Sequence, residues 1–127
     1  MVAKPPSRSL LDVAAWTPRR LRAFADRYVR ETLGRESALR AKELAFKVGM
    51  SPSEFSRLFR HVVGEFPSAY LRKKQISLAK YLLRRTSLSM NEIAYRSGFG
   101  TRTTFFRAFR RHSGLTPKEY RAQRRNG

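Results

Sequence analysis

The amino-acid sequence predicts an all-α fold in which two homologous helix-turn-helix subdomains are joined by a long linker helix, giving about seven helices. Three observations support this prediction. One stretch of the chain is repeated farther along it. The same signals for starting and ending helices recur in both copies. No segment shows the sustained alternation of apolar and polar residues that is expected of a half-buried strand.

The internal repeat consists of two blocks that recur in the same order. The segment ELAFKVGM at 43–50 matches EIAYRSGF at 92–99, and FSRLFRHVVGEFPSAY at 55–70 matches FFRAFRRHSGLTPKEY at 105–120. The second copy carries one additional residue between its blocks, where we expect a turn, and turns tolerate insertions. We therefore interpret the chain as a duplicated structural unit.

The repeat divides the chain into four predicted segments. They are an N-terminal arm or linker at 1–16, a first helix-turn-helix subdomain at 17–66, a linker helix at 67–86 and a second helix-turn-helix subdomain at 87–127. The first helix begins at Thr17–Pro18, because proline suits the first position of a helix. Its apolar positions follow the helical period and are Leu21, Phe24, Tyr28 and Leu33.

Each helix of the first subdomain has a recognisable start or end. Ala45 and Gly49 lie four residues apart, which suits a close helix crossing and a left-handed helix end. The next helix has an N-cap, a first-turn proline, a capping-box glutamate and a terminal glycine, which are Ser51, Pro52, Glu54 and Gly64. Its predicted inward face consists of Phe55, Leu58, Phe59 and Val62.

The linker helix is predicted over 67–84. Its apolar positions are Tyr70, Leu71, Ala79, Leu82 and Leu83, whereas Arg72, Lys73 and Lys74 lie on other faces. A helix of about 18 residues is roughly 27 Å long. With its end connections it could separate two recognition helices by about one turn of DNA, roughly 34 Å.

The second subdomain repeats these signals. Ser89 with Glu92 predicts a capping box, and Ala94 and Gly98 repeat the spacing of a close crossing. The recognition helix of this copy has the N-cap Thr101, the inward residues Phe105, Ala108, Phe109 and His112, and the terminal glycine Gly114. One more helix is predicted to start at Thr116, Pro117 and Glu119.

The charge of the chain indicates a polyanionic partner. It has 28 Lys and Arg against 9 Asp and Glu, a formal net charge of +19, and only Glu92 and Glu119 are acidic after Glu65. Solubilising surfaces usually mix the two signs, so nucleic acid is the favoured partner. An anionic membrane and an acidic protein are the alternatives. However, the chain lacks the continuous apolar stripe opposite lysines that membrane-active helices carry.

The outward faces of the two recognition helices, at about 52–63 and 102–112, are the predicted DNA interface. An α-helix fits the major groove of B-DNA, and arginine can contact guanine in a bidentate manner. The predicted base-reading residues on these faces are Ser53, Ser56, Arg57, Arg60, Arg102, Thr103, Phe106 and Arg107. Capping hydroxyls and basic side chains suit phosphates, and the predicted phosphate contacts are Ser51, Arg72, Lys73, Lys74, Thr101, Arg110 and Lys118. Phe106 has two interpretations, which are packing on a neighbouring helix and contact with a thymine methyl group.

No enzyme class is supported by the sequence. The absence of cysteine excludes disulfides and thiolate metal sites. His112 replaces Val62 of the first copy and is expected to be a partly buried packing residue, whereas His61 replaces Arg111 and is expected near solvent or phosphate. We therefore predict no catalytic residue, no cofactor and no metal. The alternative within nucleic-acid binding is a structured-RNA or non-specific binder, although the A-form major groove is too narrow for a helix.

The second copy, EIAYRSGFGTRTTFFRAFRRHSGLTPKEYR at 92–121, resembles the signature of the DNA-binding region of AraC/XylS-family transcription regulators. That signature combines Ile-Ala, Gly-Phe, spaced phenylalanines, Gly, Pro and Tyr-Arg, and the resemblance covers residues 17–124. It implies that Arg57 and Arg107 occupy positions where members commonly meet bases. It also aligns Ser53, Ser56, Arg102, Thr103 and Thr104 with positions that contact bases or the backbone.

The resemblance implies a function as well as a fold. We expect a sequence-specific, double-stranded DNA-binding regulator of the bacterial cytoplasm, an activator that acts through RNA polymerase. One chain carries both reading helices, so this region is expected to be monomeric. Two departures are visible. The linker helix has Gln75 where the family usually has an arginine, which puts one local contact in doubt. A sensor domain is usual in the family, so the chain is expected to be either a short member or an excised DNA-binding domain.

Overall fold

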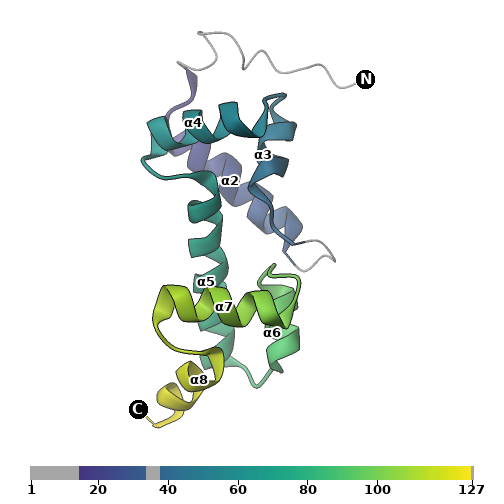
Figure 1. Cartoon of the computed structure of the whole chain (residues 1–127), viewed down its shortest axis with the longest axis vertical. Helices are drawn as coiled ribbons and strands as arrows, with labels where there is room; N and C mark the ends of the chain where they lie inside the picture. The colour runs from purple at the N-terminus through teal and green to yellow at the C-terminus, as the bar shows by residue number, and fades with distance from the viewer. Residues whose placement is uncertain (1–14, 34–37, 127) are drawn as a thin grey trace. The chain divides into compact units, whose positions relative to one another are not determined.

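The computed structural model describes residues 15–33 and 38–126, and within these ranges the chain forms seven helices and no strand (Figure 1). The all-α prediction is therefore confirmed for these residues. The helices are α2 (Pro18–Thr32), α3 (Ala41–Lys47), α4 (Pro52–Val63), α5 (Pro67–Arg85), α6 (Met90–Arg96), α7 (Arg102–Ser113) and α8 (Pro117–Asn126). Most of the predicted N-terminal arm, residues 1–14, lies outside the described residues. No helix in the described parts is long and apolar enough to cross a membrane.

The helices group into two compact units. Unit 1 comprises residues up to Glu31 together with Arg40–Leu71, and unit 2 comprises Thr32–Leu39 together with Arg72 onwards. The continuous helix α5 thus contributes its first turn to unit 1 and the rest of its length to unit 2. Each unit has its own buried core and its own pair of helices linked by a tight turn.

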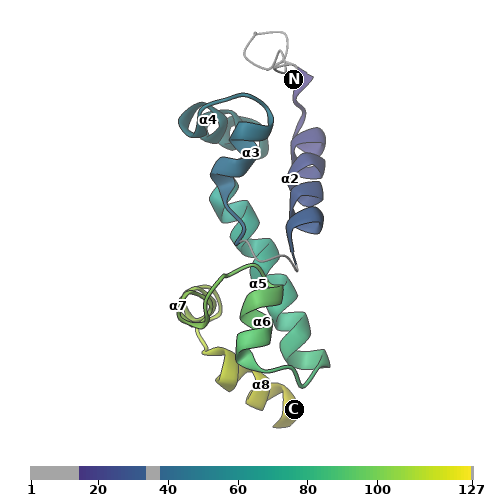
Figure 2. The ribbon, with the colours of Figure 1, turned by 90° about the vertical axis from the view of Figure 1, so that its right-hand side faces the viewer.

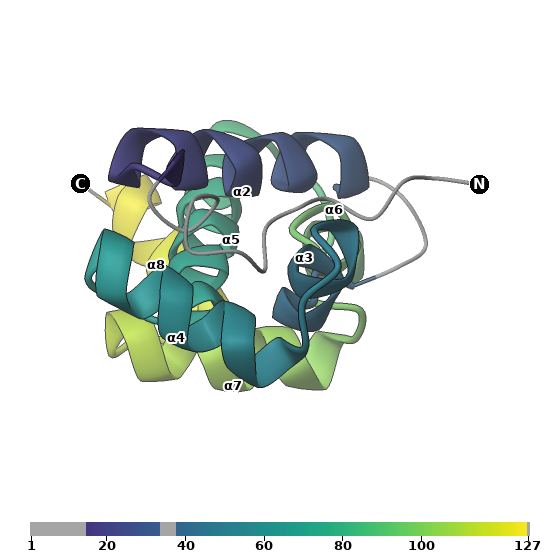
Figure 3. The ribbon, with the colours of Figure 1, turned by 90° about the horizontal axis from the view of Figure 1, so that it is seen from above.

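Unit 1 is built around a row of aromatic rings. Helix α2 lies alongside the pair α3 and α4 (Figures 2 and 3). The ring of Phe24 on α2 meets Phe55 at 6.3 Å between centroids, Phe55 meets Phe59 at 5.7 Å, and Phe59 meets Tyr70 at 5.6 Å. Phe55 and Phe59 are fully buried, which confirms the predicted inward face of α4 at its two aromatic positions. Two of these contacts, Phe24–Phe55 and Phe59–Tyr70, are edge-to-face, a geometry that adds to the free energy gained by burial.

Two tyrosine hydroxyls in unit 1 hold its helices together. Tyr28 on α2 donates a hydrogen bond to Glu43 of α3 and accepts one from the backbone N–H of Arg40 at 2.9 Å. Tyr70 donates to Asp26 Oδ1 at 2.8 Å. Burial, together with this bond to a carboxylate, raises the pKa of Tyr70 well above its ordinary value, so the hydroxyl stays a donor.

Unit 2 repeats the aromatic row. Phe99 meets Phe105 at 5.2 Å, Phe105 meets Phe109 at 5.8 Å, and Phe109 meets Tyr120 of α8 at 5.4 Å. Apolar residues from α5 and α6 complete this core, namely Ile76, Ala79, Leu82, Leu83, Ile93 and Ala94. The two copies therefore share the ring contacts of their repeated residues, Phe55–Phe59–Tyr70 and Phe105–Phe109–Tyr120, as the repeat predicts.

The helix starts are largely as predicted. Ser51 Oγ accepts from Glu54 N at 3.2 Å while Ser51 N donates to Glu54 Oε1 at 3.0 Å, a complete capping box at the start of α4. Thr116 and Glu119 form the same reciprocal pair at the start of α8. The prediction for α6 was half wrong. Ser89 caps the backbone N–H of Glu92 at 3.1 Å, but the Glu92 carboxylate pairs with Arg96 at 2.8 Å. Residues four apart on a helix lie side by side, so the Glu92 carboxylate pairs with Arg96 in place of the backbone N–H of Ser89.

The turn between α6 and α7 depends on Gly98 and Gln75. Gly98 has a φ of 76°, and a Cβ atom there would lie 2.9 Å from Leu33 Cδ2, so the position requires glycine. The buried Gln75 of α5 donates from Nε2 to the carbonyl oxygens of Ser97 at 3.1 Å and Gly98 at 2.8 Å. The glutamine at this departure from the family pattern therefore makes two buried hydrogen bonds of its own.

Candidate DNA-binding interface

Helices α4 and α7 place equivalent arginines on their exposed faces. Arg57 on α4 and Arg107 on α7 occupy the same repeat position, and both are exposed. Each follows a capped first turn, with Ser51 and Thr101 accepting from the backbone N–H three residues later. The fully buried phenylalanines on the opposite face fix the rotation of each helix about its axis. The fold thus holds a guanidinium group outward at a defined point along each helix.

The other predicted base-reading residues differ in their exposure. Ser53, Arg60, Arg102 and Thr103 are exposed, whereas Ser56, Thr104 and Phe106 are half-buried. The Thr104 hydroxyl accepts from Thr101 Oγ1 at 3.0 Å, and Thr104 N donates to the same oxygen at 3.1 Å. Thr104 is therefore engaged in capping α7, and its hydroxyl is less available to a base than that of Thr103.

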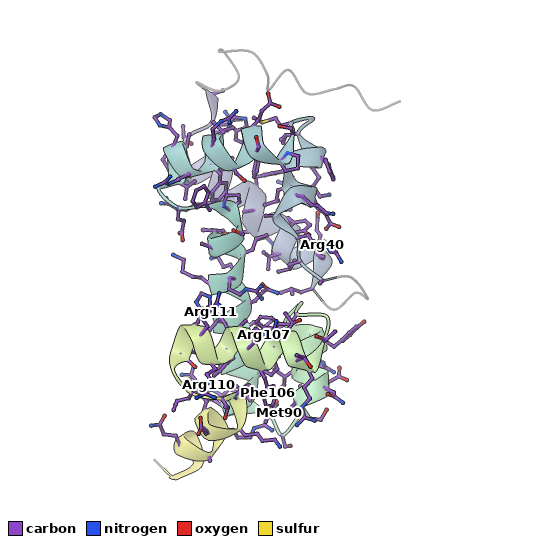
Figure 4. The ribbon with its side chains drawn as sticks, in the orientation of Figure 1. Arg40, Met90, Phe106, Arg107, Arg110 and Arg111 are labelled. Atoms are coloured by element: carbon purple, nitrogen blue, oxygen red, sulfur yellow. The ribbon has the colours of Figure 1, made fainter. Side chains whose placement is uncertain are left out.

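Phe106 packs within unit 2. Its ring meets Phe105 edge-on at 5.7 Å and lies against the same apolar cluster as Met90, while the guanidinium of Arg102 sits 5.0 Å from its centroid. Figure 4 shows Phe106 and Arg110 along one edge of α7, with Arg107 and Arg111 along the other. The Phe106 ring thus contacts the core of unit 2, as the packing interpretation expects, and it also contacts the guanidinium of Arg102.

The predicted phosphate contacts are exposed with one exception. Ser51, Lys73, Lys74, Thr101, Arg110 and Lys118 are all exposed. Arg72 is an exception, because it is half-buried and its guanidinium lies 5.1 Å from the centroid of the Phe99 ring. Burial, and after it the positive charge of Arg111, lowers the pKa of Arg72 from its ordinary value. Arg72 therefore belongs to a more enclosed site than a solvated helix face would give.

The prediction that His112 packs inward was wrong. His112 is exposed and lines a pocket of about 180 Å³ together with Arg72, Thr104, Arg107, Ala108 and Arg111. Phe109 is the last core residue of α7, and the ring of Tyr120 on α8 packs against it. The position after Phe109 on that face therefore reaches the surface. Its counterpart Val62 and the neighbouring Ala108 are half-buried rather than fully inward.

Two arginines with clear roles were missed from the sequence. Arg111 lines the pocket beside Arg72. Arg121 donates to three backbone carbonyl oxygens, those of Leu83 at 3.2 Å, Leu88 at 2.9 Å and Thr86 at 3.1 Å, and so satisfies the end of α5. Arg121 is the arginine of the Tyr-Arg pair in the quoted signature, which was the available signal. Arg111 gave none beyond its charge.

Metal chemistry finds no support in the described ranges. No group of three or more His, Cys, Asp or Glu side chains in 15–33 and 38–126 is arranged to hold an ion. The acids of the recognition helices are accounted for, since Glu54 caps α4 and α7 has no acidic residue. The two outward faces therefore offer cationic and hydroxyl groups in an arrangement suited to a polyanion.

Comparisons with known proteins agree with this geometry. A family model described as a helix-turn-helix domain matches residues 44–123. The transcriptional regulator AlkR of Acinetobacter baylyi is 39% identical over 82 residues, which are 65% of this chain and 27% of AlkR. The transcriptional activator RhaR of Cronobacter sakazakii is 45% identical over 67 residues, 53% of this chain and 24% of RhaR. The chain thus spans about a quarter of the length of these curated relatives.

A solved structure extends the similarity to most of the chain. The DNA-binding domain of the global transcriptional factor AdpA, in complex with a target DNA, superposes with a TM-score of 0.71 at 30% sequence identity. The match covers 87% of this chain and 96% of the AdpA domain. Nearly the whole of that domain therefore has a counterpart here.

Proposed function

The chain belongs to the AraC/XylS family of helix-turn-helix transcription regulators, and on that premise we propose that α4 and α7 enter two successive major grooves of one operator duplex. Sequence-specific binding of double-stranded DNA is the function of this region. The observation that carries the two-groove proposal is the matched pair Arg57 and Arg107. Each is exposed, each lies on a capped helix, and each helix is anchored from behind by two buried phenylalanines.

The residues divide into those that read sequence and those that hold the backbone. We assign base reading first to Arg57 and Arg107, because arginine recognises guanine O6 and N7 with two donors. The remaining base-reading assignments are Ser53, Ser56, Arg60, Arg102, Thr103, Thr104 and Phe106, of which Thr104 and Phe106 are the most constrained by internal contacts. Backbone contacts are assigned to Ser51, Arg72, Lys73, Lys74, Thr101, Arg110 and Lys118.

The functional division follows the repeat, with a first reading subdomain at 17–66, a linker helix at 67–86 and a second reading subdomain at 87–127. Helix α5 has 19 residues and is therefore about 28 Å long. A regular helix of this length supports two contacts on one duplex. A single chain with two reading helices needs no partner copy, so we assign DNA binding to the monomer.

Regulation is proposed from the relatives. RhaR carries the name of an activator, and activation through contact with RNA polymerase in the bacterial cytoplasm is the corresponding proposal for this chain. Because the chain spans only about a quarter of RhaR, this proposal concerns the complete regulator. Transcription from a promoter bearing the selected site, measured with and without the protein, distinguishes an activator from a repressor.

The experiment that tests sequence reading starts with selection of bound duplexes from a random pool. Binding of Arg57→Ala and Arg107→Ala is then titrated on the selected duplex and on a scrambled duplex. Each change should cost about 1–3 kcal/mol on the selected duplex and relax preference in one half of the site. Footprinting should show two protected grooves, and duplex RNA should compete poorly.

Lys73→Ala and Lys74→Ala serve as the matched controls, since both side chains are exposed on α5 rather than on a recognition helix. Their loss should weaken binding to both duplexes alike and reduce the salt slope by about one unit per contact. Equal losses on both duplexes for the two arginine variants would show that these arginines clamp the backbone instead of reading bases.

A further inference from the structure

A cationic pocket lies in unit 2 between α7 and the start of the α5 segment that belongs to that unit. We call it the Arg72 pocket, and it is lined by Arg72, Thr104, Arg107, Ala108, Arg111 and His112 with a volume of about 180 Å³. Three of its six lining residues are arginines, one is a histidine and one carries a hydroxyl group. No carboxylate lines it. Such a pocket gathers positive charge without an internal counter-ion.

Arg72 is held in this pocket by its surroundings. Arg72 is half-buried, and its guanidinium lies over the Phe99 ring, 5.1 Å from the ring centre. Burial and the nearby charge of Arg111 both disfavour its positive charge, as the direction of its pKa shift indicates. An anion placed between Arg72 and Arg111 would remove this repulsion and would replace the solvation that burial has removed.

The first copy of the repeat lacks such a pocket lining at the equivalent positions. The counterparts of Thr104, Ala108, Arg111 and His112 are Glu54, Leu58, His61 and Val62. The hydroxyl of Thr104 is thus replaced by the carboxylate of Glu54, which caps α4, Ala108 by the larger Leu58, and His112 by the apolar Val62. The chemistry of the Arg72 pocket is therefore a property of the second copy and not a consequence of the shared fold.

The donor set identifies the chemical class of the ligand. Guanidinium groups present planar, paired N–H donors that match the oxygens of phosphate, and Thr104 contributes a hydroxyl at the pocket wall. The volume is sufficient for a phosphate group with accompanying water. A base would be disfavoured, because Ala108 is the one apolar residue among those that line the pocket and no Phe, Tyr or Trp lines it.

We propose that the Arg72 pocket is a phosphate-binding site in which Arg111 and His112 join Arg72. Resting on the function proposed above, the phosphate is one backbone phosphate of the bound duplex. Arg111 and His112 thereby become DNA-contacting residues in addition to those assigned from the sequence. A free phosphate ion is the other source of the same chemistry, and the two arms of the experiment separate them.

In the DNA arm, each backbone phosphate of the selected duplex is replaced in turn by an uncharged methylphosphonate. Wild-type protein should lose roughly tenfold or more in affinity at the phosphate that enters the pocket, the usual scale of a charge-assisted hydrogen bond. Arg111→Gln should bind the unmodified duplex more weakly by a similar factor. A methylphosphonate at that one phosphate should then reduce the affinity of this variant little further. Arg85→Gln is the charge-matched control, since Arg85 is exposed on α5 outside the pocket, and it should keep the wild-type sensitivity at that position.

Arg111 is exposed, so its substitution should leave the fold intact, and an unchanged melting temperature checks this. In the second arm, without DNA, inorganic phosphate is added at constant ionic strength and the melting temperature is followed. The pocket is assigned to free phosphate if two results coincide. Phosphate raises the melting temperature of wild type and Arg85→Gln but not of Arg111→Gln, and in the DNA arm Arg111→Gln keeps the wild-type sensitivity to every methylphosphonate. If Arg111→Gln matches Arg85→Gln in both arms, the phosphate site does not exist. Because the second arm needs no duplex, it reads the pocket even if sequence discrimination fails.

Discussion

Replacing Gln75 by leucine tests whether the buried amide holds the turn of the second subdomain. The leucine has similar bulk but no donor, so the bonds to the carbonyl oxygens of Ser97 and Gly98 are lost. The Gly98 oxygen keeps a partner, because the backbone N–H of Leu39 donates to it at 3.1 Å. The Ser97 oxygen loses the bond from Gln75 in a part of the core where the Ser97 side chain is fully buried.

The expected loss of stability follows from the hydrogen bonds that Gln75→Leu removes. Two neutral hydrogen bonds contribute about 1 kcal/mol each, and an unsatisfied buried carbonyl costs about 1–3 kcal/mol, while the added leucine surface offsets part of the loss. We expect Gln75→Leu to lower the free energy of unfolding by about 2 kcal/mol. For a chain of this size that corresponds to a fall in melting temperature of roughly 6–10 °C. Urea unfolding, with its slope compared between variants, measures the change.

Two further variants make the test decisive. Gln75→Glu keeps the shape but turns the donor into an acceptor facing two carbonyl oxygens, so it should destabilise at least as much as leucine. Ser77→Ala is the control on the same helix, because Ser77 is exposed and its change should stay within about 0.5 kcal/mol. If both Gln75 variants unfold like the Ser77 variant, the amide does not hold this turn and the reasoning is refuted.

Three other predictions concern stability and binding. Phe59→Ala and Phe109→Ala should each destabilise by about 3–5 kcal/mol, because both rings are fully buried, and unchanged melting curves would contradict the assigned helix faces. Ser97→Ala should leave stability unchanged or raise it slightly, since among the described residues the buried Ser97 hydroxyl finds no hydrogen-bond partner; a measured loss above about 1 kcal/mol would reveal one. Gly98→Ala should destabilise by more than the usual glycine effect, because a φ of 76° strains an alanine and its Cβ would also lie 2.9 Å from Leu33 Cδ2, and chemical denaturation would show this.

The features that could be predicted from sequence are those set by short-range rules. The N-caps Ser51 and Ser89 each accept from the backbone N–H three residues on, and phenylalanines at helical spacing mark the inward face, as at Phe105 and Phe109. The repeat then supplied a check, since an assignment in one copy had to hold in the other. These local constraints were enough for the helix order and for the exposed position of Arg107.

The features that could not be predicted depend on neighbours distant in sequence. His112 follows the helical spacing of an inward residue, yet Tyr120 closes the core before that turn. Gln75 acquires its role only when α6 ends beside α5. The Arg72 pocket likewise needs α5 to lie next to α7, and spacing along one helix does not reveal such a partner.

The two copies share their cores and differ on their outward faces, and this difference has a measurable consequence. Helix α4 carries Arg57, Arg60 and His61 with one acid, whereas α7 carries four arginines, one histidine and no acid. Each phosphate neutralised by a basic residue contributes to the dependence of affinity on salt. Removing a backbone-contacting arginine from α7 should therefore reduce the salt slope, while the uncharged Ser53→Ala change on α4 should alter preference and leave the slope unchanged. Binding isotherms over a range of salt concentrations would show this, and equal slopes for wild type and every α7 arginine variant would refute phosphate contacts by these arginines.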